Sequence, residues 1–593
     1  MDYSDKPKVS GNAIVVILAV LLFGCIILGA ALFPTLRSML QGNANAIPAS
    51  DTTTATPAPP KDSVAIEISS SNTKEDWMDA VVAQFNAEGH QTANGQVIFV
   101  TVQHVTSGGS QRAILDGKSQ PVVWSPGDQS WIDEANTVWR DRTGQLLIPD
   151  SCDQTVLAPI GFAMWRPMAE ALGWPDKPIS WDDIAALSDN PQGWESLGHP
   201  EWGQFKFGHT HPDYSNVGLL SMTALAYSTL GKTEGLTADE VYSDTVVEAF
   251  RGVEQNTYHY GIQSRPLMQI LAQRGPTYLH AVTTSEAETL KTNAEFASTM
   301  RYPLVFIFPA KGTFWSEQPY CVLHGDWVTE EQKEAAKIFK DYLLDQKQQE
   351  MAINYYLRPI DSSIPLHAPL TLDSGTDPRV TPETIPALQS PPAEVSSAVK
   401  DVFHQTKKKA SIVLVLDISG SMEGDKIKNA VASSVNFVER LDPNDEIYLI
   451  VFGGDQVYEL GGGRAGDVGE DLTKKLNGLF ANGNTPLYDG VCSATAKVDQ
   501  LKADHEANNE KRLYGIVLLS DGQDTASVIS QNQMFNCLPS GEDVEGTKVF
   551  TIAYGADAEA DLMLRIANRT NGKTFQGDPE SIESIYNSIS AEQ

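Results

Sequence analysis

Short apolar runs alternate with amphipathic stretches over two long regions of the chain, residues 63–365 and 409–593. In the first region, VAIEIS and GQVIFVTVQHV are typical of strands, and KEDWMDAVVAQFNAEG between them repeats apolar residues from Trp77 to Phe85 at helical spacing. In the second region, SIVLVLD, EIYLIVF, LYGIVLLS and KVFTIAYG are largely apolar, as strands covered on both faces are. The alternation predicts two α/β regions with largely parallel sheets.

Polar residues indicate where several helices begin. In the second region we expect helices to start near Asp425, Asp471, Leu487, Thr525, Ala558 and Ser581. In the first region, Asn72 and Glu75 have the spacing of a capping box. The same SSSN stretch suits an anionic ligand as well, because a helix start presents free N–H groups. The pattern leaves capping alone and capping with ligand contact as alternatives.

The N-terminal segment has the length and composition of a membrane anchor. Residues 13–36 carry no charge, and a helix of that length crosses the roughly 30 Å hydrocarbon core of a bilayer. We therefore predict a transmembrane helix over residues 12–36, with residues 1–11 cytoplasmic and the main domains outside the cell membrane. A cleaved signal peptide, or a lipid-modified Cys25, is the alternative, although the apolar run is longer than a signal peptide requires.

Two segments contain no pattern that predicts an independent core. Residues 37–62 are rich in Thr, Ala and Pro and are predicted to be a disordered linker. Residues 366–408 begin proline-rich and end in the amphipathic SSAVKDVFHQT, which indicates a connector that packs against a domain.

The cysteines fit an oxidising compartment. Outside the apolar helix there are two in each half, and the pairing that needs no contact between the halves is Cys152 with Cys321 and Cys492 with Cys537. Four separate buried thiols are the alternative.

The net charge of −33 is spread along the chain. No basic stripe follows from this distribution, so nucleic acid is not an expected partner.

The first region resembles the extracellular solute-binding proteins of bacterial uptake systems. The resemblance is carried by SSSNTKEDW, VVWSPGDQSWIDEAN, FGHTHPDYSNVGLLSMTALAYSTLG, AVTTSEAE and FIFPAKGTFWSEQPYCVL, in that order. It implies two α/β lobes with a ligand cleft between them. A small polar or anionic solute is expected there, and the candidate contacts are Ser70, Ser71, Asn72, Ser125, Ser215 and Asn216. Trp124, Trp131 and Trp315 are either stacking residues of this cleft or core residues.

Acids and hydroxyls follow the apolar strands of the second region. Asp417 ends one strand and precedes Ser419 and Ser421, Asp521 follows another strand, and Thr485 lies in a loop before a helix. Parallel strands bring such positions to one edge of the sheet, and hard oxygen ligands suit Mg²⁺, Mn²⁺ or Ca²⁺.

These five positions, and the whole second region, resemble the von Willebrand factor type A (VWA) domain with its metal-ion-dependent adhesion site (MIDAS). The family pattern of Asp-x-Ser-x-Ser, then threonine, then aspartate is complete here. The resemblance implies a Rossmann-like open sheet and a cation that accepts a carboxylate from a protein or peptide partner. Phosphatases with an acid at a strand end need a second acid two residues later, where this chain has Ser419, so no enzyme activity is expected.

Two functions remain as hypotheses. The first is a membrane-anchored binding or adhesion protein, single-pass in the cell membrane, that captures a protein partner through the metal site and holds a small solute in the other domain. The second is the solute-binding component of an ABC-type uptake system, with the VWA domain as a scaffold.

Overall fold

The computed structural model describes residues 59–539, 546–555 and 558–577. The predicted transmembrane helix, nearly all of the predicted linker and the helix expected near Ser581 lie outside these residues. Among the helices within them, none has the length and apolarity to cross a membrane.

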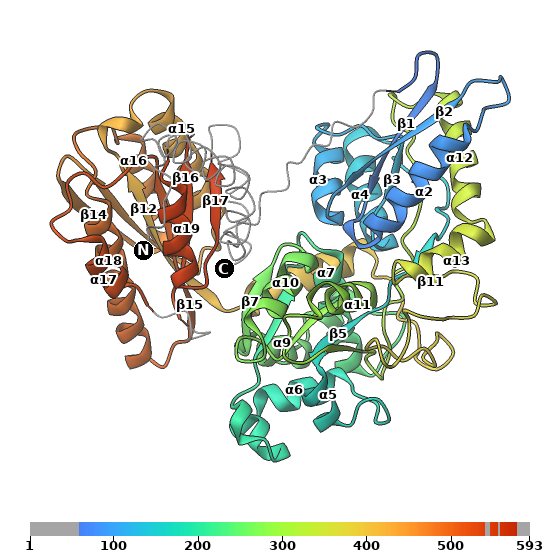
Figure 1. Ribbon diagram of the computed structural model, residues 1–593, viewed down its shortest axis with the longest axis horizontal. Coiled ribbons are helices and arrows are strands. Elements are labelled where there is room, and N and C mark those ends of the chain that lie inside the picture. The colour runs from blue at the N-terminus through green and yellow to red at the C-terminus, as the bar shows by residue number, and fades with distance from the viewer. Residues whose placement is uncertain (1–58, 540–545, 556–557, 578–593) are drawn as a thin grey trace, which may run out of the picture. The chain divides into compact units, whose positions relative to one another are not determined.

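The first lobe of the N-terminal region is a four-stranded sheet in the order β10-β3-β1-β2 (Figure 1). Its strands are β1 (Val64–Ser70), β2 (Ile98–His104), β3 (Val123–Ser125) and β10 (Cys321–Val322). The associated helices are α2 (Glu75–Glu88), α3 (Ser107–Leu115), α4 (Gln129–Thr143), α12 (Glu330–Leu343) and α13 (Gln346–Asn354). The apolar stripe read from the sequence does face the core, because Trp77 and Phe85 on α2 are fully buried. Only β10 runs antiparallel to its neighbour.

The second lobe is a five-stranded sheet in the order β7-β6-β8-β5-β9. Its strands are β5 (Ile160–Trp165), β6 (Phe207–Thr210), β7 (Thr257–Gly261), β8 (Ala281–Ser285) and β9 (Leu304–Ile307). The helices are α5 (Arg166–Leu172), α6 (Trp181–Asp189), α7 (Asn216–Leu230), α8 (Ala238–Val241), α9 (Asp244–Gln255), α10 (Ser264–Arg274) and α11 (Glu286–Phe296). The expectation of a largely parallel sheet is wrong for β5, which lies antiparallel to both β8 and β9.

The connector packs, as its composition indicates. Its helix α14 (Ala393–Thr406) contacts α4 of the first lobe and α7, α8 and α9 of the second. Lys400 binds Glu134 on α4, and Val395, Val399 and Phe403 are buried in the core. Helix α14 is therefore a structural part of the N-terminal region.

Three further contacts involve the segments that lead from one lobe to the other. Strand β4 (Val156–Leu157) pairs antiparallel with β11 (Arg358–Pro359), and the predicted disulfide between Cys152 and Cys321 is present. Arg358 on β11 also forms a fully buried ion pair with Glu286, the first residue of α11, at 2.6 Å.

The C-terminal region is a six-stranded sheet in the order β14-β13-β12-β15-β16-β17 (Figure 1). Its strands are β12 (Lys409–Asp417), β13 (Glu446–Gly453), β14 (Gln456–Arg464), β15 (Arg512–Ser520), β16 (Lys548–Tyr554) and β17 (Thr574–Gly577). Side chains of β12 alternate between two cores. Ile412 and Leu414 pack on the side of α15 (Asp425–Arg440) and α16 (Ala465–Asn477). Val413 and Val415 pack with α17 (Leu487–Ala507), α18 (Gln531–Cys537) and α19 (Ala560–Arg569).

Two edge strands of this sheet, β14 and β17, were not expected from the sequence. Strand β14 is antiparallel to β13, and the two are joined by Gly454 and Asp455, which both have positive φ. Two such residues form the type I′ turn of a tight hairpin, and the Gly-Asp pair was the available signal. The sheet is therefore largely parallel, as predicted, with one antiparallel strand at this edge.

Three predicted helix starts are also wrong. Helix α16 begins at Ala465, not near Asp471, and α18 begins at Gln531, not near Thr525, because Ser530 and Gln533 form a capping box there. Helix α2 begins at Glu75 after a short 3-10 turn over Asn72–Lys74, so Asn72 does not cap it.

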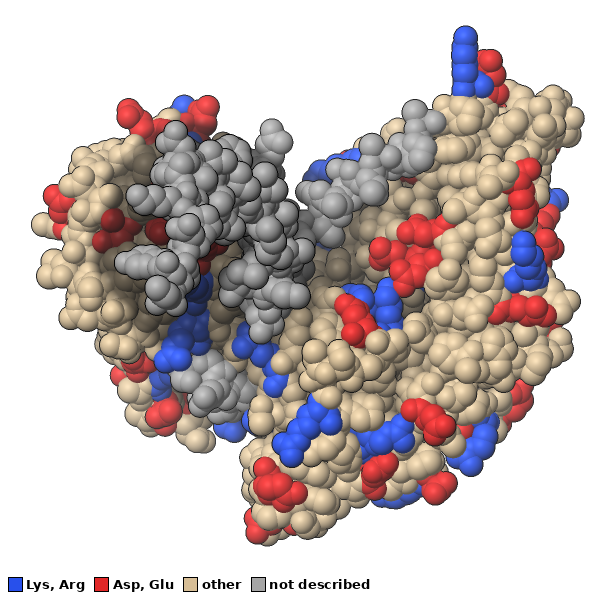
Figure 2. Space-filling model, in the orientation of Figure 1, with Lys and Arg blue, Asp and Glu red and all other residues tan. Residues whose placement is uncertain are grey.

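Basic and acidic side chains are interspersed on the face of the molecule drawn in Figure 2. The expected absence of a nucleic-acid partner stays a prediction.

Candidate functional sites

The acids and hydroxyls predicted to bind a metal lie at the carboxyl edge of the C-terminal sheet. Asp417 is the last residue of β12, and Asp521 directly follows β15, which is the parallel neighbour of β12. Ser419 and Ser421 lie in the turn after β12, and Thr485 lies in the loop before α17. The topology thus places all five residues where the sequence predicted them.

Hydrogen bonds join these residues into one cluster. The Ser421 hydroxyl donates to Asp521 Oδ1 at 2.7 Å and lies 3.0 Å from the Ser419 hydroxyl. Asp417 accepts from the Ser419 backbone N–H at 2.8 Å and from the Ser520 hydroxyl at 2.5 Å. A side chain at Gly522 would lie 3.5 Å from Ser421 Oγ and 3.8 Å from Thr485 Oγ1, so Thr485 faces the same small space.

The cluster concentrates negative charge in a poorly solvated position. Asp417 and Asp521 are buried, whereas Ser421 is exposed. Burial raises the pKa of Asp417 to about 6, against the lowering by the Ser419 and Ser520 hydrogen bonds. Lys426 on α15 binds Asp521 Oδ2 at 2.5 Å, so a positive charge already compensates one of the two acids. Sequence reasoning missed Lys426 and Ser520.

The three loops of this edge are fixed to one another. Gly420 N–H donates to Gly483 O at 2.9 Å, which joins the serine turn to the Thr485 loop. Thr485 N–H donates to the Thr525 hydroxyl at 2.8 Å, which joins that loop to the segment after Asp521. This cross-bonding positions the oxygen atoms before any ligand arrives.

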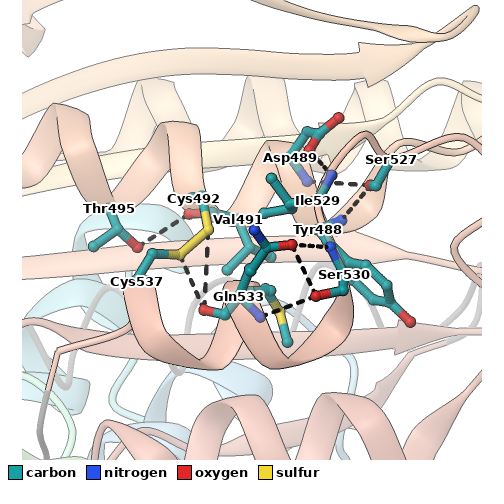
Figure 3. The surroundings of a disulfide bond; sticks show 11 residues. Tyr488, Asp489, Val491, Cys492, Thr495, Ser527, Ile529, Ser530, Gln533 and Cys537 are labelled. Carbon is teal, nitrogen blue, oxygen red and sulfur yellow. Dashed lines mark hydrogen bonds between the residues drawn. A yellow bond between two sulfur atoms is a disulfide. The ribbon is translucent and has the colours of Figure 1, made fainter.

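The segment that follows Asp521 is also held to α17 (Figure 3). Asp489 on α17 accepts hydrogen bonds from the backbone N–H groups of Val528 and Ile529, and the predicted disulfide between Cys492 and Cys537 joins α17 to α18. The hydrogen bonds of Asp489 and the disulfide both restrict the segment that follows Asp521.

The predicted solute contacts lie in the N-terminal region and are mostly buried. Ser70 ends β1, Ser125 ends β3, and Asn216 is the first residue of α7. The Ser71 hydroxyl donates to Gln318 Oε1 at 2.6 Å, and the Ser125 hydroxyl donates to the backbone oxygen of Pro319 at 2.6 Å.

A single polar network connects the two lobes at these residues. Gln318 Nε2 donates to Ser316 Oγ at 3.0 Å, and Asn216 Nδ2 donates to the same oxygen at 3.2 Å. Asn216 in turn accepts from Trp131 Nε1 at 2.9 Å. The structure therefore joins Ser71 to Asn216 through Gln318 and Ser316.

Lys74 places a buried amino group at one end of this network. Its Nζ donates to Ser125 O at 2.9 Å, Gln318 Oε1 at 3.0 Å and Ser71 Oγ at 3.2 Å, which are all neutral acceptors. Lys74 is 1% exposed, and burial holds its pKa well below the usual value. A buried ammonium with only neutral partners is the arrangement that an anion would stabilise.

Ser316 and Gln318 both have positive φ, at 46° and 49°. Such backbone conformations are unfavourable for residues other than glycine and cluster at functional sites. Sequence reasoning missed Ser316, Gln318 and Lys74, since the network depends on a backbone conformation that the sequence does not signal.

Three other predicted solute contacts, Ser70, Ser215 and Asn72, do not join the lobe-to-lobe network. Ser70 reaches only the Ser71 backbone oxygen, at 3.4 Å, and the Ser215 hydroxyl accepts from Thr210 within its own lobe. Asn72 Oδ1 is buried without a hydrogen-bond partner. Trp124, Trp131 and Trp315 are buried, which agrees with the core alternative.

Comparison with known protein families matches each region separately. Residues 66–358 match the family model described as bacterial extracellular solute-binding protein, and residues 411–588 match that of the von Willebrand factor type A domain. The chain carries a domain of each kind. The first match includes Lys74 and the whole lobe-to-lobe network, and the second includes Asp417, Ser419, Ser421, Thr485 and Asp521.

Two of the curated relatives match less than a third of this chain. An uncharacterized protein of Synechocystis is 24% identical over 180 residues, which are 30% of this chain and 40% of the relative. Human inter-alpha-trypsin inhibitor heavy chain H4 is 26% identical over 171 residues, covering 27% of this chain and 17% of the relative. The chain thus spans less than half the length of these relatives.

Solved structures resemble both domains at low TM-scores. The sulfate-binding protein SubI of Mycobacterium tuberculosis is 14% identical, with a TM-score of 0.36, and the match covers 51% of this chain and 88% of that protein. A von Willebrand factor type A protein of Catenulispora acidiphila is 16% identical, with a TM-score of 0.25, over 31% of this chain and 42% of that protein. Likenesses of this degree do not identify a ligand.

Proposed function

We propose that this protein is a membrane-anchored, extracytoplasmic binding protein that captures a protein partner through a divalent cation and a small anionic solute through its other domain. A solute-binding-like domain together with a VWA domain supports a binding or adhesion role. The observation that carries the finer proposal is the convergence of five oxygen-bearing side chains at one edge of the VWA sheet.

The VWA cluster fits a hard divalent cation. Asp417, Ser419, Ser421, Thr485 and Asp521 offer two carboxylates and three hydroxyls, and Mg²⁺ prefers such ligands in proteins, with Mn²⁺ and Ca²⁺ as alternatives. When bound, the cation supplies an electrophilic position for a carboxylate of the partner. Lys426 competes with it for Asp521, so moderate affinity is expected.

The proposal is one of binding without catalysis. Asp417 is committed to hydrogen bonds from Ser419 and Ser520, and Ser419 stands where an aspartyl phosphatase carries its second acid.

The solute-binding domain is proposed to take an anion at Lys74. Replacing Lys74 by methionine removes the buried charge and keeps most of the side-chain volume. We expect sulfate, molybdate or a sugar phosphate to raise the melting temperature of the wild type and not that of Lys74→Met. Tryptophan fluorescence measures this domain specifically, because all 11 tryptophans lie between residues 77 and 327.

A matched control for this experiment is Lys118→Met, because the Lys118 side chain is 78% exposed and pairs only weakly with Asp116. This variant should respond to anions as the wild type does. Equal stabilisation of Lys74→Met and wild type would contradict the anion assignment, and so would stabilisation of the wild type by neutral sugars alone.

The anchor is proposed from residues 12–36, which lie outside the described part of the structure. We expect membrane-extracted protein to keep its original N-terminus, and Edman sequencing or intact mass measures this. A mature chain beginning after Ala46, or a lipid on Cys25, would show that the anchor is cleaved or replaced.

The uptake hypothesis draws on the same solute-binding match. Genes for a permease and an ATPase beside this gene would favour it over adhesion.

A further inference from the structure

Two histidines and an aspartate meet on the solute-binding domain, away from the VWA metal cluster. His211 and Asp213 lie in the loop between β6 and α7, and His404 lies in the last turn of α14. Asp213 Oδ2 lies 3.0 Å from His404 Nε2 and 3.8 Å from His211 Nδ1. One ligand atom from each residue can be chosen so that all three lie within 4.8 Å of one another.

This donor set differs in chemistry from the VWA cluster. Imidazole nitrogen favours zinc, copper, nickel and iron, whereas Mg²⁺ and Ca²⁺ favour oxygen. We propose that His211, Asp213 and His404 form a binding site for a divalent transition-metal ion of the Zn²⁺ class. Three protein ligands leave one tetrahedral position for water or another ligand.

The ligand atoms are close to the separation that zinc requires. Zinc bonds of about 2.0–2.2 Å in a tetrahedral site put ligand atoms about 3.3 Å apart. The His404–Asp213 distance of 3.0 Å is already that short. The side chain of His404 is 38% exposed, so it can rotate to complete the site, and Asp213 is 27% exposed.

Local packing orients the groups, and Lys400 and Lys407 near them are each paired with an acid. His211 Nδ1 accepts a hydrogen bond from the Asp213 backbone N–H at 3.2 Å, and metal binding through Nδ1 would replace this bond. The His211 ring also packs edge-on against Phe403, at 4.9 Å between ring centroids. Lys400, one turn before His404, is held by Glu134 at 2.9 Å.

The position of the site gives the metal a structural role. His404 belongs to the connector helix, whereas His211 and Asp213 lead directly into α7, whose first residue is Asn216 of the lobe-to-lobe network. A metal held by all three residues ties α14 to the second lobe. It should therefore stabilise the domain against unfolding.

The test is titration of the full chain with Zn²⁺ in excess Mg²⁺, which saturates a VWA site of the proposed kind. We expect one Zn²⁺ per chain and a higher melting temperature by tryptophan fluorescence. Each of His404→Ala and Asp213→Asn should weaken Zn²⁺ binding at least about 10-fold, because losing even an outer-shell partner commonly costs that much. Co²⁺ in place of Zn²⁺ should give d–d absorption bands that His404→Ala abolishes.

Two control variants distinguish this site from surface histidines and from the VWA cluster as the place where Zn²⁺ binds. His199 pairs with Glu201 at 3.0 Å on the surface without a third metal-binding group in the described structure, so His199→Ala should bind Zn²⁺ as the wild type does. Asp417→Ala should also keep Zn²⁺ binding. Zn²⁺ affinity that is unchanged in His404→Ala, or lost equally in His199→Ala or Asp417→Ala, would overturn the proposal.

Discussion

Replacing Asp417 by alanine or asparagine is expected to abolish measurable Mg²⁺ binding by the protein. Asp417 supplies one of only two carboxylates in the cluster, and the affinity of oxygen-ligand sites rises steeply with ligand charge. Losing half the charge should weaken binding by roughly 100-fold or more. Isothermal titration with Mg²⁺ and Mn²⁺, in the absence of Zn²⁺, measures this.

The asparagine variant is the more informative of the two. Asp417 accepts hydrogen bonds from the Ser419 N–H and the Ser520 hydroxyl, and asparagine retains one acceptor oxygen where alanine retains none. A binding defect in Asp417→Asn with unchanged circular dichroism therefore reports on charge and not on folding. Asp425→Ala is the matched control, because this acid begins α15 and is 85% exposed. Wild-type Mg²⁺ affinity in Asp417→Asn would refute the metal assignment.

Replacing Arg358 by methionine is expected to destabilise the solute-binding domain by about 3–5 kcal/mol. The Arg358 and Glu286 side chains are 4% and 0% exposed and form two parallel hydrogen bonds of 2.6 and 2.7 Å. Removing the guanidinium leaves a carboxylate buried without its partner, which is the costly outcome. Urea unfolding followed by tryptophan fluorescence measures this domain without a contribution from the VWA domain.

Two further variants test whether the effect arises from the unpaired charge. Arg379 also forms a pair of hydrogen bonds, with Asp377, but is 62% exposed, so Arg379→Met should cost far less stability than Arg358→Met. The double variant Arg358→Met with Glu286→Gln should recover part of the stability, because no charge remains buried. Equal losses in Arg358→Met and Arg379→Met would argue against the mechanism.

The grouping of acids and hydroxyls in the VWA domain was predictable because it follows from the order of the strands. Once β12 and β15 are parallel neighbours, Asp417 and Asp521 must meet at the same edge. The lobe-to-lobe network was not predictable in the same way. It depends on Gln318 and Ser316 in left-handed backbone conformations, which their residue types do not favour. The helix expected near Thr525 failed because tertiary hydrogen bonds hold that segment as a loop.

The site of His211, Asp213 and His404 depends on tertiary structure still more. His211 and Asp213 are separated by one residue in sequence, but the third group comes from a helix nearly two hundred residues later. Only the packing of α14 on the second lobe brings it there.

The connector helix α14 also leaves only a very short linker between the two domains. Only Lys407 and Lys408 separate the end of α14 from the start of β12, a distance of about 10 Å at full extension. Helix α14 rests on helices of both lobes, so it cannot keep all of its contacts if the lobes separate. The far end of β12, an interior strand of the VWA sheet, carries Asp417. If the proposed solute moves the lobes, the short connection would pass that movement to β12, whose far end carries Asp417.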